Sequence, residues 1–299
     1  MFSWIFIIIV AYFFLSLSAF GDKLILKGSV YPKLYVFYVG FLGGFIAFLI
    51  PFIHFSLPSP QAFLWIFIEA VTFILGLYFM YSAVESFDAS RVAPVIGAFQ
   101  PLIILSLSWI FFDALIGGKD ILAFVVLILG TIIISFESKL KISKKFLKLT
   151  LLAALMFALE FISLKLVFGH QSFLEGLIWT RIVICAIVLF FLLDKKIRKE
   201  IFEKRNIFNK ATGALFLFSQ SMGGLAIFLQ NFAISLAPIS YLAIMNALRG
   251  LQYVFLFIIT LFFSIFLPKI LREETSKKAI FRKVSGLLLI IIGLFILLF

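Results

Sequence analysis

Ten long hydrophobic segments fill this sequence and constrain its fold more than any other feature. They cover about residues 2–20, 34–52, 61–82, 92–112, 119–136, 149–168, 173–193, 211–234, 239–267 and 281–299. A helix needs about 20 apolar residues to cross the hydrocarbon core of a bilayer, and short connections join these segments. We therefore predict an all-α integral membrane protein with ten transmembrane helices packed as one bundle, without a soluble domain.

The composition and the placement of charge support a membrane protein and argue against a nucleic-acid partner. The chain is 64% hydrophobic and 13% charged, whereas a soluble domain is about 45–50% apolar and about 25% charged. The net charge of +12 is concentrated in three loops, residues 137–148, 194–210 and 269–283. All three follow odd-numbered segments, so they share one face, which the positive-inside rule makes cytoplasmic. We predict a multi-pass plasma-membrane protein with both termini outside.

The sequence also contains a weak internal duplication. Residues 81–112 can be aligned with residues 231–262 at an offset of 150, with matching hydropathy and helix breaks. This divides the chain into a first five-helix repeat over 1–148 and a second over 149–299. Because five is odd, the two repeats have opposite orientations in the membrane. Inverted repeats of this kind are typical of secondary transporters.

Four full charges lie well inside the hydrophobic segments: Glu69, Glu160, Arg181 and Arg249. A guanidinium facing lipid costs several kcal/mol or more, so Arg249 must face protein, water or a ligand. Asn246, Gly250 and Tyr253 fall on the same predicted helical face as Arg249. Two acids and two bases balance, which favours pairing inside the bundle.

These charges and the nearby amides form the predicted substrate site. Arg249 is expected to anchor a carboxylate or phosphate, with Glu69 or Glu160 as its resting partner or as a proton acceptor. The polar stripe of the eighth segment and two further amides supply a hydrogen-bonding wall. The predicted substrate-binding residues are Arg249, Glu69, Glu160, Gln220, Asn231, Asn246, Gln100 and Tyr253. A purely structural role, in which Arg249 pairs with a buried glutamate and fixes helix register, stays open.

Motifs of enzymes and metal sites are absent from the sequence. It contains no HExxH, no CxxC, no glycine-rich phosphate loop and no cluster of Asp suited to magnesium. Its two histidines, His54 and His170, both lie near loops. We predict no catalytic residue, no metal, no cofactor and no enzymatic activity.

Several stretches make the chain similar to a known transporter group. The first segment ends near Lys23, residues 179–181 (Trp-Thr-Arg) open the seventh, and short turns join the third to the fourth and the eighth to the ninth. The fifth and tenth contain LILGTIII (127–134) and LLLIIIGLFILL (287–298). In these features the whole chain resembles the ten-span EamA-type permeases of the drug/metabolite transporter superfamily.

The resemblance implies a secondary transporter that moves a small polar or amphipathic metabolite, such as an amino acid, by alternating access. It also implies that the first, third and fourth spans and their mates surround a midplane cavity, with the fifth and tenth outside. Expected partners are the small-molecule substrate and membrane lipids. Proton coupling stays open, as does the choice between a monomer and a homodimer.

Three alternatives remain at this stage. A lipid or lipid-linked-sugar flippase would use the same fold, with a cavity lined mostly by Phe. A membrane-embedded transferase would need acids and a bound metal at a membrane surface, which the sequence lacks. In a structural or receptor protein, the buried charges would only pair with one another.

Overall fold

The predicted all-α architecture is confirmed. The computed structural model describes residues 3–25, 32–87, 89–114, 116–135, 143–202, 210–266 and 277–298. Within these ranges nearly every residue is helical and none is in a strand. The long apolar runs explain this, because a helix satisfies its backbone hydrogen bonds within one segment and can therefore lie in hydrocarbon.

Each predicted hydrophobic segment lies in a helix or in a helix that changes type. The helices are α1 (Ser3–Ile25), α2 (Pro32–Gly43) continued by the 3-10 helix η1 (Gly44–Phe52), α3 (Pro60–Ser86), α4 (Ala89–Phe112), α5 (Gly118–Ser135), α6 (Lys144–His170), α7 (Phe173–Leu189) continued by the 3-10 helix η2 (Phe190–Leu193), α8 (Lys195–Phe202), α9 (Lys210–Leu236), the 3-10 helix η3 (Ile239–Tyr241), α10 (Leu242–Ala247), α11 (Gly250–Phe266) and α12 (Lys277–Leu298). The hydropathy pattern did not predict α8, nor the division of the ninth segment into η3, α10 and α11.

Eight helical stretches among the described residues are long and apolar enough to cross a membrane. In α12 the apolar part is shorter, Val284–Leu298, and α5 is not among the eight. Several spans are therefore established, and the number ten stays a prediction.

The helices form two compact units that interleave along the sequence. Unit 1 comprises Met1–Lys27, Ala93–Lys141 and Lys210–Phe299, and unit 2 comprises Gly28–Val92 and Ile142–Asn209. Each unit thus takes helices from both predicted halves of the chain.

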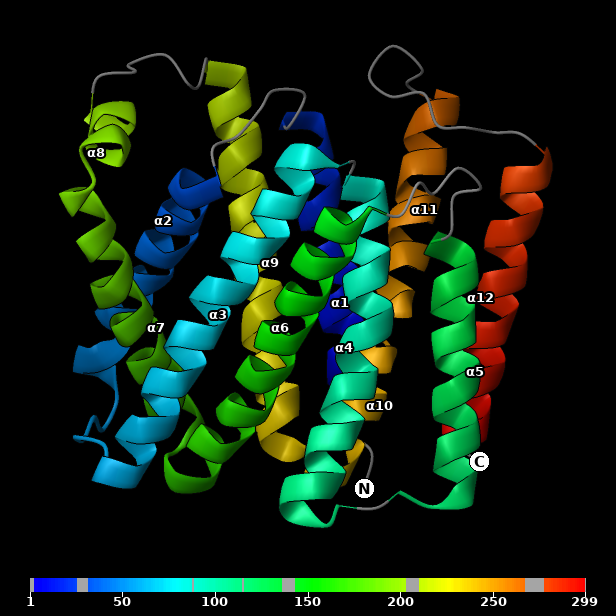
Figure 1. Cartoon of the computed structure of the whole chain (residues 1–299), viewed down its shortest axis with the longest axis horizontal. Helices are drawn as coiled ribbons and strands as arrows, with labels where there is room; N and C mark the ends of the chain where they lie inside the picture. The colour runs from blue at the N-terminus through cyan, green and yellow to red at the C-terminus, as the bar shows by residue number, and fades with distance from the viewer. Residues whose placement is uncertain are drawn as a thin grey trace. The chain divides into compact units, whose positions relative to one another are not determined.

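In unit 1, α1 packs along α9 and α5 packs along α12, while α11 contacts both α1 and α5. Figure 1 shows α5 and α12 side by side. Small residues permit these close approaches. The Ser219 hydroxyl donates to the Ser18 carbonyl at 2.9 Å between α9 and α1, and Gly130 of α5 lies against the backbone of α12. Small and hydroxyl-bearing side chains are the usual contacts between helices in membranes.

In unit 2, α3 packs along α6, and α7 contacts both α2 and α3. Here too glycines mark the contacts, because a Cβ at Gly76 would lie 2.7 Å from the Phe157 ring and one at Gly40 would lie 2.7 Å from Val188. The apolar core of this unit includes Val36, Ala70 and Ile184.

Several helix contacts can be related to one another if each helix is replaced by its predicted mate in the other half of the sequence. If α6 and α9 are the repeat mates of α1 and α3, then the α1–α9 contact of unit 1 corresponds to the α6–α3 contact of unit 2. The α5–α12 and α2–α7 contacts each join a helix to its own mate. A duplicated five-helix repeat would produce this pattern, and the division into 1–148 and 149–299 stays a prediction that it supports.

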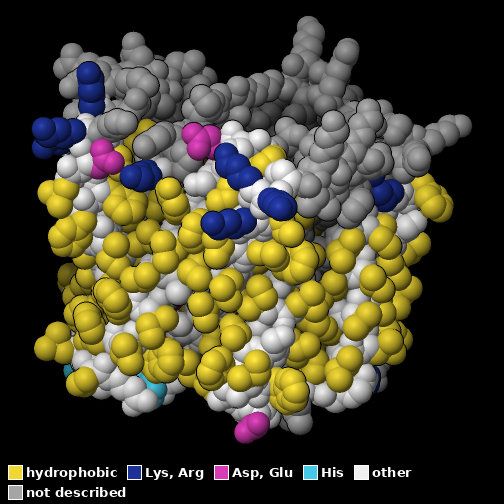
Figure 2. Space-filling model, viewed as in Figure 1, with side chains coloured by type: hydrophobic (Ala, Val, Ile, Leu, Met, Phe, Trp, Pro, Cys, Tyr) yellow, Lys and Arg dark blue, Asp and Glu magenta, His cyan; other side chains and the backbone are white. Residues whose placement is uncertain are grey.

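Large apolar side chains cover much of the molecular surface. Phe6, for example, is 72% exposed, and many other Phe, Leu and Ile side chains of the helices are exposed too. Figure 2 shows hydrophobic side chains spread along the helices in view. Soluble monomers do not expose apolar surface on this scale, so these faces belong in lipid. The protein is a multi-pass membrane protein, as predicted.

The close contact between α5 and α12 leaves no room for a side chain at Gly130. A Cβ at Gly130 would lie 2.9 Å from the Gly286 carbonyl oxygen and 3.0 Å from the Ile290 amide nitrogen, and backbone atoms cannot rotate away. Gly130→Ala should therefore destabilise the protein by about 1–3 kcal/mol and lower its midpoint of thermal unfolding in detergent.

Gly224→Ala is the matched control for Gly130→Ala. Nothing lies within 4 Å of a Cβ at Gly224 of α9, so this substitution should leave the midpoint unchanged or raise it through better helix propensity. Equal midpoints for the two variants would contradict the close α5–α12 contact.

Candidate functional site

The ninth hydrophobic segment is a broken helix, and Arg249 lies at the break. Regular helix ends with α10 at Ala247 and resumes with α11 at Gly250, so Leu248 and Arg249 form a turn. The amides of Arg249, Leu251 and Gln252 donate to carbonyls three residues back, at 2.9–3.0 Å, instead of four. This tighter bonding replaces the regular pattern that a continuous helix would have.

The break frees a backbone carbonyl, and α1 supplies its partner. In a regular helix the Arg249 amide would donate to Met245, but here it donates to Asn246. The Tyr12 hydroxyl instead donates to the Met245 carbonyl at 2.9 Å, and Tyr12 is only 1% exposed. A buried carbonyl without a donor would cost about 1–3 kcal/mol. Tyr12 therefore stabilises the broken conformation.

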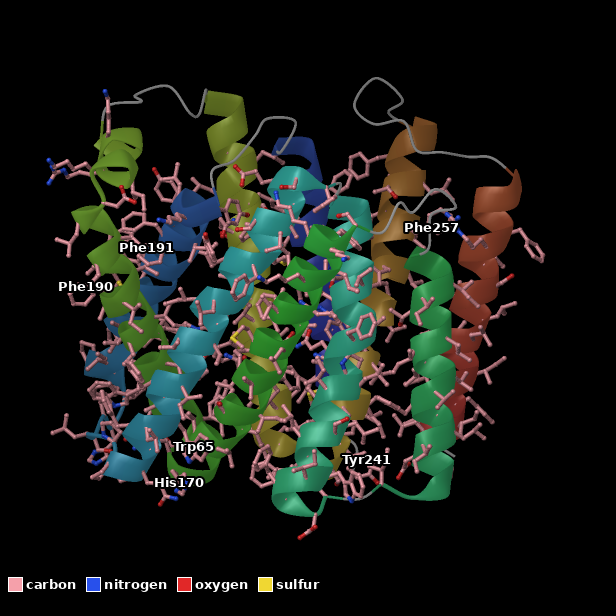
Figure 3. All side chains as sticks on the ribbon, viewed as in Figure 1. Trp65, His170, Phe190, Phe191, Tyr241 and Phe257 are labelled. Atoms are coloured by element: carbon pink, nitrogen blue, oxygen red, sulfur yellow. The ribbon has the colours of Figure 1, made fainter. Side chains whose placement is uncertain are left out.

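The start of the ninth segment is also held within unit 1. The Tyr241 hydroxyl, at the end of η3, lies 3.4 Å from a carboxylate oxygen of Asp120 at the start of α5. The Tyr241 ring also contacts Trp4 of α1, with 5.9 Å between centroids, and Figure 3 labels Tyr241 at this end of the unit. The short η3–α10 piece is thus fixed at its beginning by Tyr241 and near its end by Tyr12.

Within the described part of the chain, Arg249 makes two long hydrogen bonds, both to neutral side-chain amides. Its Nη1 donates to the Gln100 side-chain oxygen of α4 at 3.3 Å, and its Nε donates to the Gln252 side-chain oxygen at 3.4 Å. Charge-assisted bonds to a carboxylate are typically 2.7–2.9 Å and about twice as strong as neutral ones. Among the described residues, both hydrogen bonds of the guanidinium are therefore long, and both of its partners are uncharged.

Two tyrosine hydroxyls complete the surroundings of Arg249. The Tyr253 hydroxyl donates to the Ala93 carbonyl of α4 at 3.0 Å, and a Cβ at Gly97 would lie 3.0 Å from that hydroxyl oxygen. The charge of Arg249 acts electrostatically on both Tyr12 and Tyr253. Arg249, Gln100, Gln252, Tyr12 and Tyr253 form what we call the arginine cluster, contributed by α1, α4 and the ninth segment.

Not every residue of the predicted helical face points into the arginine cluster. The Cα of Gly250 faces Thr131 of α5 and Ile290 of α12, so any side chain there would collide with them. The turn at Arg249 rotates the chain, which separates Gly250 from the face that the regular period predicted. Gly250 is needed for helix packing immediately beside the break.

Two predicted amides of unit 1 are buried with unused hydrogen-bonding capacity. Asn246 of α10 is 1% exposed and its Oδ1 accepts no bond in the described part of the chain. The same holds for the Nδ2 of Asn231 on α9, which donates none. Buried polar atoms are usually satisfied, so such atoms are candidates to contact a ligand or an ordered water. Gln220 of α9 is half-buried. Among the described residues, it makes no hydrogen bond to the arginine cluster.

Unit 2 contains a second buried charged group, formed by Glu69, Glu160 and Arg181. Glu69 of α3 is completely buried, and among the described residues neither of its carboxylate oxygens has a hydrogen-bond partner. The charges that act on it are an attraction from Arg181 of α7 and a repulsion from Glu160 of α6. The Thr72 hydroxyl, one turn away, donates to backbone carbonyls of α3 instead of to Glu69. We call these three residues the carboxylate cluster.

Arg181 is positioned by an aromatic ring. Its guanidinium carbon lies 5.1 Å from the centroid of the Phe73 ring, one turn from Glu69 on α3. A cation over an aromatic face gains roughly 0.5–2 kcal/mol, which partly offsets the burial of Arg181. The predicted pairing of Arg249 with Glu69 or Glu160 involves residues of different units and stays a prediction.

Sequence reasoning identified most of these residues but not all. It named Arg249, Gln100 and Tyr253, and it missed Gln252 and Tyr12. The signal for Gln252 was present, since it lies three residues after Arg249 on a helix. Tyr12 lies in a run of aromatic and aliphatic residues, and nothing in its spacing indicates a polar contact. Among the described residues, no group of three or more His, Cys, Asp or Glu could hold a metal ion.

The comparisons with known proteins agree with this architecture. One solved structure, titled "Crystal structure of protein", superposes with a TM-score of 0.72 over 98% of this chain and 97% of that chain. At 14% sequence identity this likeness shows the fold alone. No curated protein sequence matches the chain.

A sequence model of the EamA-like transporter family matches residues 2–136. This region contains α1 and α4, which contribute Tyr12 and Gln100 to the arginine cluster. It also contains Glu69 of the carboxylate cluster. This match over the first part of the chain supports the family resemblance that the sequence indicated.

Proposed function

We propose that this protein is a secondary transporter that moves a small anionic or zwitterionic metabolite, amino acids included, by alternating access. The observation that carries the proposal is a guanidinium at a helix break whose partners in the described chain are two long bonds to neutral amides. An ionised carboxylate or phosphate would gain more from Arg249 than either amide does. Arg249 is therefore the proposed anchor for the anionic group of the substrate.

The broken helix adds to the attraction for an anion. α11 starts at Gly250, directly after Arg249, and a helix N-terminus carries a partial positive charge. Discontinuous helices in secondary transporters place such ends at the substrate. We propose that the substrate replaces Gln100 and Gln252 at Arg249, and that the freed amides then bond its remaining polar atoms.

We further propose that the carboxylate cluster couples transport to protons, with Glu69 as the proton carrier. A buried carboxylate without hydrogen-bond donors is costly, whereas its protonated form is neutral. A conformation that admits water to Glu69 would favour loss of the proton, and burial would favour its return.

Replacing Arg249 tests the anchor. Arg249→Ala should reduce counterflow of the transported metabolite in proteoliposomes by about 100-fold, because it removes the only charge proposed to bind the anionic group, a loss of about 2–5 kcal/mol when the bound pair is desolvated. The purified variant should remain folded and monodisperse. Lys119→Ala is the control, because it removes an exposed positive charge from the start of α5 in the same unit. Unchanged counterflow in Arg249→Ala would remove Arg249 from the site.

Tyr12→Phe tests the role of the helix break. It removes only the hydroxyl that bonds the Met245 carbonyl, so it should lower the midpoint of thermal unfolding and reduce the maximal transport rate more than the apparent affinity. Tyr78→Phe in α3 is the control, since the Tyr78 hydroxyl makes no hydrogen bond in the described residues and its loss should change neither quantity. Identical behaviour of the two variants would show that the break does not depend on Tyr12.

Glu69→Gln tests proton coupling. The amide keeps the shape of the side chain but cannot carry a proton at neutral pH. Uptake driven by an imposed pH gradient should therefore fall to background, while metabolite exchange without a gradient should continue. Glu85→Gln, at the exposed end of the same helix, should keep both activities. Gradient-driven uptake by Glu69→Gln at the wild-type rate would exclude Glu69 as the carrier.

A further inference from the structure

α8 is a short amphipathic helix that follows the end of a membrane span in unit 2. Its sequence is KKIRKEIF, and the Asp194 carbonyl accepts the first helical bond from the Arg198 amide at 3.0 Å. Ile197 is 1% exposed, whereas Lys195, Arg198 and Lys199 are exposed. α8 contacts α2 and η2, so Ile197 is covered by the unit while these three basic side chains face outward.

Two large apolar side chains directly before α8 are also exposed. Phe190 and Leu193 of η2 are 69% and 78% exposed, while Phe191 between them packs against the apolar core of unit 2. Figure 3 shows Phe190 on the outer side of the end of α7 and Phe191 on the inner side. An outward apolar surface therefore continues into an outward basic surface within ten residues of chain.

Other basic residues lie at the same end of unit 2. Lys33 at the start of α2 is 3.5 Å from Asp194, which fixes α2 to the start of α8. Lys145 at the start of α6 donates to Ser86 at the end of α3 at 2.9 Å. Figure 2 shows the Lys and Arg side chains of these helices above the hydrophobic surface. The positive charge of this unit is thus concentrated where its helices would leave the hydrocarbon.

We propose that α8 and η2 form a binding site for one class of ligand, an anionic phospholipid. Lys195, Arg198 and Lys199 would contact the phosphate, and Phe190 and Leu193 would contact the acyl chains. Basic clusters beside a membrane span attract anionic headgroups, and amphipathic helices lie in the interface with their apolar side inward. The adjacent apolar side chains favour a lipid over a free phosphate, which would contact the charges alone.

The bound lipid would act separately from the substrate site. Neither α8 nor η2 contributes a residue to the arginine or the carboxylate cluster. In this arrangement the lipid holds α8 against α2 and the end of α7, and it sets the depth of unit 2 in the bilayer. The inference therefore does not depend on the transported substrate or on proton coupling.

Binding of phosphatidylglycerol to the purified full-length protein in detergent tests this site. Native mass spectrometry and the rise in the midpoint of thermal unfolding should both report tighter binding of phosphatidylglycerol than of phosphatidylcholine. The variant K195Q/R198Q/K199Q should bind phosphatidylglycerol at least about tenfold more weakly, because each basic residue near a headgroup contributes favourably. Inorganic phosphate at equal concentration should produce no comparable rise in the midpoint.

A charge-matched variant separates this site from the general positive charge of the protein. K119Q/K144Q/K148Q also removes three exposed positive charges but leaves α8 intact, so it should bind phosphatidylglycerol as the wild type does. Equal losses in the two triple variants would overturn the proposal, as would equal binding of the two lipids. If the first triple variant does not fold, F190A/L193A replaces it. It should weaken phosphatidylglycerol binding, and unchanged binding would contradict the site.

Discussion

The structure of unit 1 depends on one requirement, that polar groups inside an apolar bundle must have partners. The ninth segment breaks at Leu248 and Arg249, which removes the regular donor of the Met245 carbonyl. Tyr12 replaces that donor from α1, and Tyr253 bonds α4 in the same region. Without the Tyr12 hydroxyl, the buried Met245 carbonyl would lose this donor. Tyr12 therefore stabilises the helix break at which Arg249 lies.

In our proposal, the two clusters divide the chemistry of transport between the two units. The arginine cluster has a positive charge whose described partners are neutral, which would suit an anionic substrate. The carboxylate cluster has a buried acid without hydrogen-bond donors among the described residues, which would suit a proton. Each unit is assembled from helices of both sequence halves. If the predicted inverted repeats are present, each unit therefore contains helices of both repeats.

The sequence predicted the fold well because hydropathy reports directly on membrane spans. Within the described residues, most of each predicted segment is helical, and the mid-segment charges Glu69 and Arg181 are buried. Three features could not be predicted. The break at Arg249 depends on backbone hydrogen bonds that hydropathy does not detect, and Tyr12 lies in an aromatic-rich run without a polar pattern. α8 lies in a basic loop and has only eight residues, so a search for long hydrophobic segments does not detect it.

We propose that Arg249 exchanges its amide partners for the anionic group of a substrate. An experimental structure of the protein with its transported metabolite bound would test this exchange. We expect a carboxylate or phosphate oxygen within about 3 Å of the Arg249 guanidinium, with Gln100 and Gln252 displaced from it. A metabolite bound elsewhere, with Arg249 still bonded to both glutamines, would show that Arg249 is not the anchor.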